Sequence, residues 1–264
     1  MASDSPGPNA HPMRIKEQFS RQAKIFAEAP ELHGEAALAL LVEAAKPRST
    51  DETLDVACGP GSVVVAMARH ARHSIGLDAT AAMLVEAQRL ARAQAMPNVE
   101  WRQGDVYALP FDSDRFDIVT CRFAFHHFER PAAALQEMVR VCKREGCIVV
   151  CDAIASDSPR KAEAFNRMER LRDPSTVEFR PLEALLALFA GAGLPSPERR
   201  FFQVPAEREQ MVKRSFPAGA DYDGLRRVID TSVDDDSMGL GARRCGDTVL
   251  FRYPSVILST TKAG

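Results

Sequence analysis

The sequence lacks an apolar run long enough to cross a membrane, and residues 1–8 lack the basic and apolar regions of a signal peptide. None of its six cysteines forms a CxxC pair, and most of them lie within apolar runs. This pattern indicates buried free thiols rather than disulfides or a zinc site. These absences predict a cytoplasmic protein with no membrane partner.

An excess of basic residues is also absent, since 34 Lys and Arg against 36 Asp and Glu give a net charge of −2. Such a chain offers no electrostatic footprint for nucleic acid or anionic lipid. We therefore expect a small molecule as its partner, while a monomer and a homodimer both remain open. A composition of 45% hydrophobic and 27% charged residues is typical of a globular protein, and 264 residues permit one α/β domain with insertions.

The pattern along the chain predicts a tail followed by a single domain. Residues 1–14 are rich in Pro, Gly and Ser and are expected to form a mobile tail. Residues 15–47 have helical periodicity interrupted at Pro30 and Gly34, which predicts two leading helices. Residues 15–264 are expected to form the domain.

Residues 48–154 alternate short β-prone runs with helical periods, which is the pattern of βαβ units and a parallel sheet. The expected strands are residues 53–58, 74–78, 99–102, 116–121 and 147–151. The expected helices between them are residues 62–71, 81–94 and the segment after Pro131. Five consecutive units agree with one another and predict the core of the fold.

After Asp152 the pattern changes. Residues 155–195 contain two expected helices, at 158–171 and 181–192, and form an insertion over the core. Residues 196–264 contain two strand-like runs, at 199–204 and 254–260, separated by a charged insertion at 206–246. The expected fold is therefore α/β, with a doubly wound, mostly parallel sheet.

The stretch Leu-Asp-Val-Ala-Cys-Gly-Pro-Gly-Ser at residues 54–62 is a β-prone run that ends in a glycine turn and opens into a helix. This arrangement is typical of a nucleotide-cofactor site, because glycines let the backbone approach the ligand and the helix N-terminus offers free N–H groups. A dinucleotide fingerprint is incomplete here, since Val64 occupies the position of the third glycine. A nicotinamide-dependent dehydrogenase is therefore disfavoured.

Three further motifs follow in order: Gly-Leu-Asp at 76–78, Gly-Asp-Val at 104–106 with Leu-Pro-Phe at 109–111, and Phe-Asp-Ile-Val-Thr-Cys-Arg-Phe-Ala-Phe-His-His-Phe at 116–128. With residues 54–61 they make the chain resemble the class I S-adenosylmethionine-dependent methyltransferases, in particular the small-molecule enzymes similar to the ubiquinone/menaquinone-biosynthesis methyltransferases. The resemblance covers about residues 15–200. It implies a Rossmann-like sheet of seven strands, S-adenosylmethionine as cofactor and S-adenosylhomocysteine as product.

The resemblance also implies roles for individual residues. The cofactor-binding residues would be Phe19, Gln22, Asp55, Ala57, Gly59, Gly61, Asp78, Ala79, Met83, Gly104, Asp105, Val106, Cys121 and Arg122. Asp78 would accept hydrogen bonds from both ribose hydroxyls, since a carboxylate has two oxygens for two donors. Asp105 would bind the adenine amino group, with the Val106 N–H facing a ring nitrogen. The turn that includes Asp55 would lie under the methionine and ribose.

Each role has a structural alternative. Asp78 precedes a helix and suits a helix cap, although Thr80 is the more natural cap. The Met83 side chain fits either an apolar contact beside the adenine or ordinary packing in the hydrophobic core. Arg122 fits either a ligand carboxylate or a structural salt bridge. The helix that contains Phe19, Gln22 and Phe26 corresponds to one that closes over the cofactor in relatives, and ordinary amphipathic packing explains it equally well.

His126 and His127 follow the fourth expected strand, at the sheet edge where ligands bind in doubly wound folds. Histidine titrates near neutrality, so either residue suits an acid or base in methyl transfer. Neighbouring side chains of an extended segment point to opposite sides, which predicts that one of the two, His126, faces the pocket. Backbone anchoring of this loop is the alternative role.

Methyl transfer from a sulfonium requires no metal, and the run Asp234-Asp235-Asp236 is typical of a solvated turn. The Asn/Asp-Pro-Pro-aromatic motif of enzymes that methylate nucleic-acid bases is missing after the fourth strand. The sequence therefore predicts O- or C-methylation of a small organic acceptor, with residues 15–45 and 155–245 as lids. A non-methylating enzyme such as a cyclase and a non-catalytic cofactor-binding protein remain the alternatives.

Overall fold

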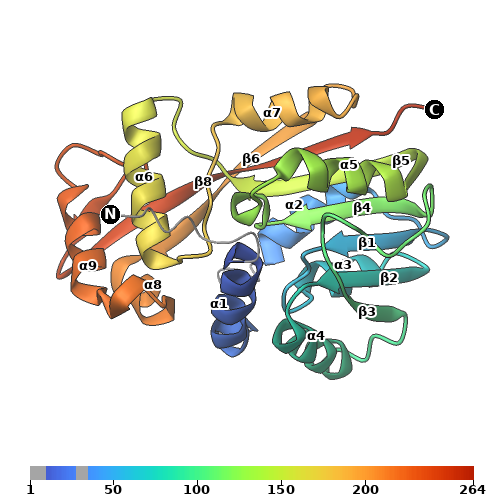
Figure 1. The fold of residues 1–264 in the computed structure, drawn as a ribbon, viewed down its shortest axis with the longest axis horizontal. Coiled ribbons are helices and arrows are strands. Elements are labelled where there is room, and N and C mark those ends of the chain that lie inside the picture. The colour runs from blue at the N-terminus through green and yellow to red at the C-terminus, as the bar shows by residue number, and fades with distance from the viewer. Residues whose placement is uncertain (1–9, 28–34) are drawn as a thin grey trace.

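The computed structural model describes residues 10–27 and 35–264 and shows one mixed sheet flanked by helices (Figure 1). The strands are β1 (Glu52–Val56), β2 (His73–Asp78), β3 (Val99–Gln103), β4 (Phe116–Arg122), β5 (Cys142–Ala153), β6 (Glu198–Glu207), β7 (Arg243–Cys245) and β8 (Thr248–Thr261). The helices are α1 (Ala10–Ala27), α2 (Glu35–Ala45), α3 (Ser62–Ala68), α4 (Ala81–Ala93), α5 (Pro131–Val141), α6 (Pro159–Arg172), α7 (Leu182–Gly191), α8 (Arg208–Arg214) and α9 (Tyr222–Thr231). Two short 3₁₀ helices are η1 (Phe125–His127) and η2 (Ala218–Ala220).

The strand order is β3-β2-β1-β4-β5-β8-β6, with β7 paired to β8 at one side. Strands β1 to β5 are parallel, and β8 runs antiparallel to both β5 and β6. The expectation of a doubly wound, mostly parallel sheet is confirmed. The order reverses between β1 and β4, which is where ligands bind in open α/β sheets.

Two apolar layers cover the sheet. On one face, α5 and α7 bury Leu135 and Phe189 against Val119 of β4. On the other face, α2 and α3 pack against Ile118 and Val149, the neighbouring strand positions that point the opposite way. Because both faces are covered, the strands read as nearly continuous apolar runs rather than as an alternating pattern.

The two insertions form a common apolar cluster at one end of the sheet, to the left in Figure 1. Phe165 of α6, Val212 of α8 and Ile229 of α9 are buried there against Phe251 of β8. The last strand was expected at residues 254–260, but it begins at Thr248. Residues 248–253 form its additional part, which pairs with β7 at its start and with β6 from Leu250 onward and packs against these helices.

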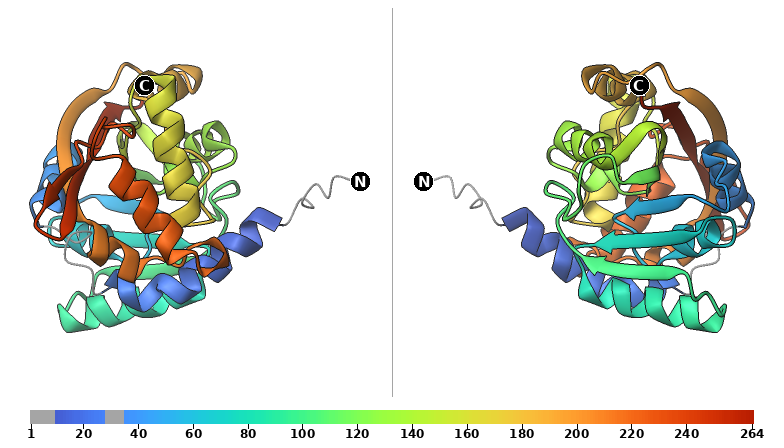
Figure 2. Two further views of the ribbon diagram at one scale, coloured as in Figure 1. Left: turned by 90° about the vertical axis from the view of Figure 1, so that its left-hand side faces the viewer. Right: turned by 90° about the vertical axis from the view of Figure 1, so that its right-hand side faces the viewer.

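Helix α1 begins at Ala10, ahead of the expected domain boundary at residue 15. It packs against α4 of the core and α8 of the insertions and so connects the two parts (Figure 2). Residues 1–9 of the expected tail, and the expected break at Pro30 and Gly34, lie outside the described residues. Within the described ranges, no helix combines the length and apolarity that spanning a membrane requires.

All six cysteines are free. Cys58, Cys121, Cys142 and Cys151 are buried, Cys147 is half-buried and Cys245 is exposed. The expectation of free thiols is confirmed, and Cys245 departs from the expectation that they are buried.

Candidate functional site

A cleft with a cavity volume of about 800 Å³ lies at the carboxyl ends of β1, β2 and β4. This volume lies within the range of small-molecule and cofactor sites. The cleft brings together twelve of the predicted site residues: Phe19, Asp55, Ala57, Gly59, Asp78, Ala79, Met83, Gly104, Asp105, Val106, Arg122 and His127. Most of the residues that the sequence predicted for the site therefore line this one cleft.

The glycine turn after β1 is held by a carboxylate from the next strand. The Gly59 N–H donates to Asp78 Oδ2 at 2.9 Å, and the Thr80 N–H donates to Asp78 Oδ1 at 2.8 Å. Gly59 has a φ of +51°, and a Cβ built on it would meet no atom within 4 Å, so its backbone faces open space. The Asp78 side chain lines the cleft, and burial raises the pKa of its carboxyl while these hydrogen bonds lower it.

Asp55 lies deeper in the cleft and is 4% exposed. Its Oδ1 accepts a hydrogen bond from Thr120 Oγ1 at 2.6 Å. Burial raises the pKa of Asp55 to about 7, and the hydrogen bond from Thr120 only partly opposes this effect. A buried carboxyl of this kind gains most from a cationic ligand, because the cation stabilises its ionised form.

Arg122, at the end of β4, also lines the cleft. Its guanidinium lies 4.6 Å from the ring centre of Phe123, and its Nε and Nη2 are buried with no hydrogen-bond partner among the described residues. Unpaired buried N–H groups are costly, so an anionic group bound here would satisfy them. Asp55 and Arg122 together fit the ammonium and carboxylate of an amino-acid moiety, as S-adenosylmethionine carries.

Three of the predicted cofactor-binding residues lie away from the cleft wall. Gly61 has a φ of +86°, and a Cβ at this position would lie 2.5 Å from the Trp101 ring, so close packing requires this glycine. Cys121 is fully buried in the core beneath α5, because its side chain points to the opposite face of β4 from Arg122. Gln22 is buried and donates from Nε2 to Asp173 Oδ2 at 3.2 Å. The side chain of Phe26 lies outside the described part.

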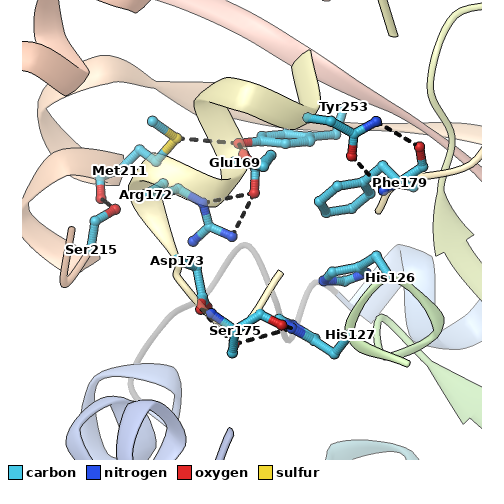
Figure 3. Close-up of polar contacts among 12 residues, drawn as sticks. His126, His127, Glu169, Arg172, Asp173, Ser175, Phe179, Met211, Ser215 and Tyr253 are labelled. Atoms are coloured by element: carbon cyan, nitrogen blue, oxygen red, sulfur yellow. Dashed lines mark hydrogen bonds and ion pairs between the residues drawn. The ribbon is translucent and has the colours of Figure 1, made fainter. Parts of the chain in front are cut away.

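A second, smaller cavity of about 180 Å³ adjoins the cleft. Both share Phe19, Phe123 and His127 in their walls. The smaller cavity is bounded mainly by aromatic and apolar side chains from β6, β8 and α8, with Glu169, Arg172 and Asp173 from the end of α6 (Figure 3). Sequence reasoning missed these charged residues, because their positions in a polar amphipathic helix gave no sign of burial.

His126 lines the smaller cavity and is anchored by Asp152, the penultimate residue of β5. Its Nδ1 lies 2.8 Å from Asp152 Oδ1, and its backbone N–H donates to Asp152 Oδ2 at 3.0 Å. The carboxylate requires a proton on Nδ1, which leaves Nε2 available on the other side of the ring. The ring stacks on Phe179 with centroids 4.0 Å apart. Asp152 was not predicted, although an acidic residue at a strand end was a usable signal.

His127 lines both cavities. Its Nδ1 lies 3.0 Å from the Ser175 carbonyl oxygen, so Nδ1 carries the proton and Nε2 an unshared lone pair. The Ser175 Oγ in turn donates to Asp173 Oδ1 at 2.5 Å. Burial, and then the neighbouring His126, lower the pKa of His127 below its ordinary value. This imidazole is therefore neutral at physiological pH.

The expectation that only one of the two histidines faces a pocket is wrong. Both rings lie on the smaller cavity with centroids 4.2 Å apart. The physical reason is that Phe125–His127 form a 3₁₀ helix, so successive side chains are not on opposite sides as in a strand.

Helix α1 covers the junction of the two cavities. The Phe19 ring meets His127 edge to face with centroids 4.9 Å apart, and His11 Nε2 lies 2.9 Å from the His127 carbonyl oxygen. Gln22 adds its contact with Asp173. No group of three or more His, Cys, Asp or Glu side chains in residues 10–27 and 35–264 is arranged to hold a metal ion.

Comparison with known proteins agrees with this geometry. Residues 54–150 match the model of a methyltransferase domain. The chain is 32% identical over 221 residues to YcgJ of Bacillus subtilis, which is named an uncharacterized methyltransferase, and the match covers 84% of each chain. It is 35% identical over 123 residues to the ubiquinone/menaquinone biosynthesis C-methyltransferase UbiE of Roseobacter denitrificans, covering 46% of this chain and 49% of that one.

Solved structures share the fold. The crystal structure of YcgJ from Bacillus subtilis has a TM-score of 0.79 at 27% identity and covers 87% of this chain and 99% of that one. A geranyl diphosphate C-methyltransferase from Streptomyces coelicolor, solved with S-adenosylhomocysteine, has a TM-score of 0.61 at 16% identity and covers 87% of this chain and 76% of that one. The second likeness is evidence for the fold alone.

The protonation state of His127 can be tested directly. We expect its imidazole to stay neutral, with the proton on Nδ1, at pH values about one unit below the ordinary histidine pKa of about 6.5. The cause is burial, which disfavours the charged ring. Nitrogen-15 chemical shifts of the ring, assigned with a His127→Gln variant, report both properties. A charged His127 ring near pH 5.5 would contradict this assignment.

Proposed function

Because the chain belongs to the class I S-adenosylmethionine-dependent methyltransferases, we propose that it transfers a methyl group to an oxygen or carbon of a small organic acceptor. The observation that carries this proposal is the junction of the two cavities at Phe19, Phe123 and His127. The larger cleft suits the cofactor, and the smaller cavity suits an acceptor beside it. Close approach of the two reactants is the main requirement of a displacement reaction.

S-adenosylmethionine is the cofactor, and when bound it supplies an electrophilic methyl group on a positively charged sulfonium. We propose that Asp78 accepts hydrogen bonds from its ribose and that Asp105 and Val106 contact its adenine. Asp55 and Arg122 would hold its amino-acid end, which the raised pKa of Asp55 and the unpaired nitrogens of Arg122 support. Ala79 and Met83 complete the wall beside them.

His126 is the proposed general base. Its Nε2 would take the proton of an acceptor hydroxyl or acidic C–H as the new bond to the methyl carbon forms and the bond from that carbon to sulfur breaks. Asp152 would stabilise the imidazolium that results and keep the ring oriented. Burial lowers the pKa of His127 and makes it a weak base, so we propose that it serves as a fixed hydrogen-bond acceptor at the junction.

The name of the UbiE relative, a C-methyltransferase, supports a carbon acceptor, while a hydroxyl acceptor suits His126 equally well. A cytoplasmic location, supported by the six free cysteines, is also part of the proposal.

The alternative reaction is a cyclisation. A solved [4+2]-cyclase shares the fold, with a TM-score of 0.61 at 17% identity. Product mass separates the two reactions.

Asp78 provides the first test. We expect Asp78→Ala to weaken S-adenosylmethionine binding by about 100-fold, since it removes charge-assisted hydrogen bonds and frees the Gly59 turn. Isothermal titration calorimetry measures the affinity. Asp112→Ala, an exposed carboxylate outside the cleft, is the matched control and should bind like wild type. Wild-type affinity in the Asp78 variant would refute the ribose assignment.

Asp55 predicts a pH dependence of cofactor binding. With a pKa of about 7, this carboxyl is largely protonated in the free protein below pH 7 and must release its proton to face a cation. Affinity should therefore rise with pH, by at most about tenfold per unit, and level off above about pH 7. Titrations in two buffers of different ionisation enthalpy count the released protons. Asp55→Asn should bind without this dependence, and a flat wild-type profile would contradict the assignment.

His126 provides a test of the chemistry. We expect His126→Ala to slow methyl transfer about 100- to 10,000-fold while cofactor affinity stays near wild type, because His126 lies outside the cofactor cleft. Small phenols and 1,3-dicarbonyl compounds serve as acceptors, with mass spectrometry as readout. A product heavier by one methyl group, with S-adenosylhomocysteine released, supports methylation. An isomerised product of unchanged mass would instead support a cyclase.

A further inference from the structure

We infer that the smaller cavity selects a compact, planar acceptor with a hydroxyl at one end and a neutral carbonyl oxygen at the other. The hydroxyl would face His126 and His127, and the carbonyl oxygen would face Arg172. This inference rests on the proposed function, because it names the acceptor class of the same site. Arg172 is then a specificity-determining residue for which sequence reasoning gave no role.

The size and walls of the cavity set the body of the acceptor. A cavity of about 180 Å³ between Phe19, Phe123, Phe179 and Tyr253 has room for one ring and a few substituent atoms. For comparison, an apolar protein cavity of about 150 Å³ takes up benzene. Aromatic walls favour a flat molecule, since rings gain from stacked and edge-to-face contacts. A long apolar tail exceeds this volume.

Arg172 supplies the donors at one end. Its Nε donates to Glu169 Oε2 at 2.9 Å, and its Nη2 lies 2.7 Å from the same oxygen. The other Glu169 oxygen accepts from the Tyr253 hydroxyl at 2.6 Å, so this carboxylate is satisfied. Among the described residues, Nη1 of Arg172 has no hydrogen bond or ion pair. A guanidinium has five N–H donors, so Arg172 keeps some of them for a ligand.

The histidines supply the opposite chemistry. His126 and His127 have Nδ1 occupied by Asp152 and by Ser175, which leaves an acceptor nitrogen on each ring. Figure 3 shows the Arg172 guanidinium on one side of an opening and the two imidazoles on the other. An acceptor that satisfies both ends must donate a hydrogen bond to the imidazoles and accept one from the guanidinium.

Charge around the cavity favours a neutral carbonyl over a carboxylate. The buried carboxylates of Asp152, Glu169 and Asp173 already outnumber Arg172. Burial raises the pKa of Asp173, but Arg172 and the hydrogen bonds from Ser175 outweigh this effect and lower it. Glu207 and Arg214 in the same wall add one charge of each sign. A further anion would add repulsion that the Arg172 guanidinium, already neutralised by Glu169, does not offset.

Three small phenols of similar size test the inference: 4-hydroxyacetophenone, 4-ethylphenol and 4-hydroxybenzoate. Calorimetry measures their binding to the protein saturated with S-adenosylhomocysteine, so no methyl transfer is needed. We expect the ketone to bind about 10- to 100-fold more tightly than the ethyl compound, the effect of a hydrogen bond to a charged group, and more tightly than the carboxylate. Equal affinities, tighter binding of the carboxylate, or no binding of any of the three would overturn the inference.

Variants at Arg172 test whether this residue causes the preference for the ketone over the ethyl compound. Arg172→Met should reduce the ratio of ketone to ethyl affinity to about one, and Arg172→Lys, which keeps the charge that Glu169 requires, should keep part of it. Arg170→Met, on the same helix but outside the cavity, should preserve the wild-type ratio. An unchanged ratio in a folded Arg172→Lys or Arg172→Met protein contradicts the assignment. A ketone preference without methyl transfer would instead count against the proposed function alone.

Discussion

One interaction is made twice along the functional edge of this sheet: a carboxylate at the end of one strand binds the backbone N–H of the loop that follows the neighbouring strand. Asp78 of β2 holds Gly59 after β1, and Asp152 of β5 holds His126 after β4. Each carboxylate is buried, so its desolvation is offset by the N–H groups it receives. The cleft that we propose for the cofactor and the smaller cavity that we propose for the acceptor both depend on loops fixed in this way.

The sequence revealed the cofactor side far better than the acceptor side. Regular alternation of strands and helices predicted the core, and strand-end residues such as Asp55 and Asp78 lie in the cleft because parallel strands end at one edge. Gly61 and Cys121 show the limit of motif reasoning, since packing against Trp101 and the strand face decide where they point. Contacts such as that of Glu169 with Tyr253 join residues far apart in the chain, and no local pattern encodes them.

The two histidines illustrate how local geometry changes chemistry. An extended segment would separate their rings, whereas the 3₁₀ turn places both on one cavity. The two rings also differ in their hydrogen-bond partners. His126 contacts a carboxylate directly, whereas His127 is connected to Asp173 only through the Ser175 hydroxyl. Asp152 fixes the orientation of the His126 ring, whereas burial lowers the pKa of His127 and keeps that ring neutral.

Strand β8 spans both parts of the molecule as one continuous strand, Thr248–Thr261. Its second half lies between β5 and β6 in the sheet, while its first half pairs with β6 from Leu250 onward and carries Tyr253 at the smaller cavity. Because the two parts share this strand, the smaller cavity that we propose for the acceptor is built on the same sheet as the cleft that we propose for the cofactor. Residues of α8, between β6 and β8, line the smaller cavity and not the cleft. A change in that segment would therefore alter the smaller cavity while leaving the residues that line the cleft in place.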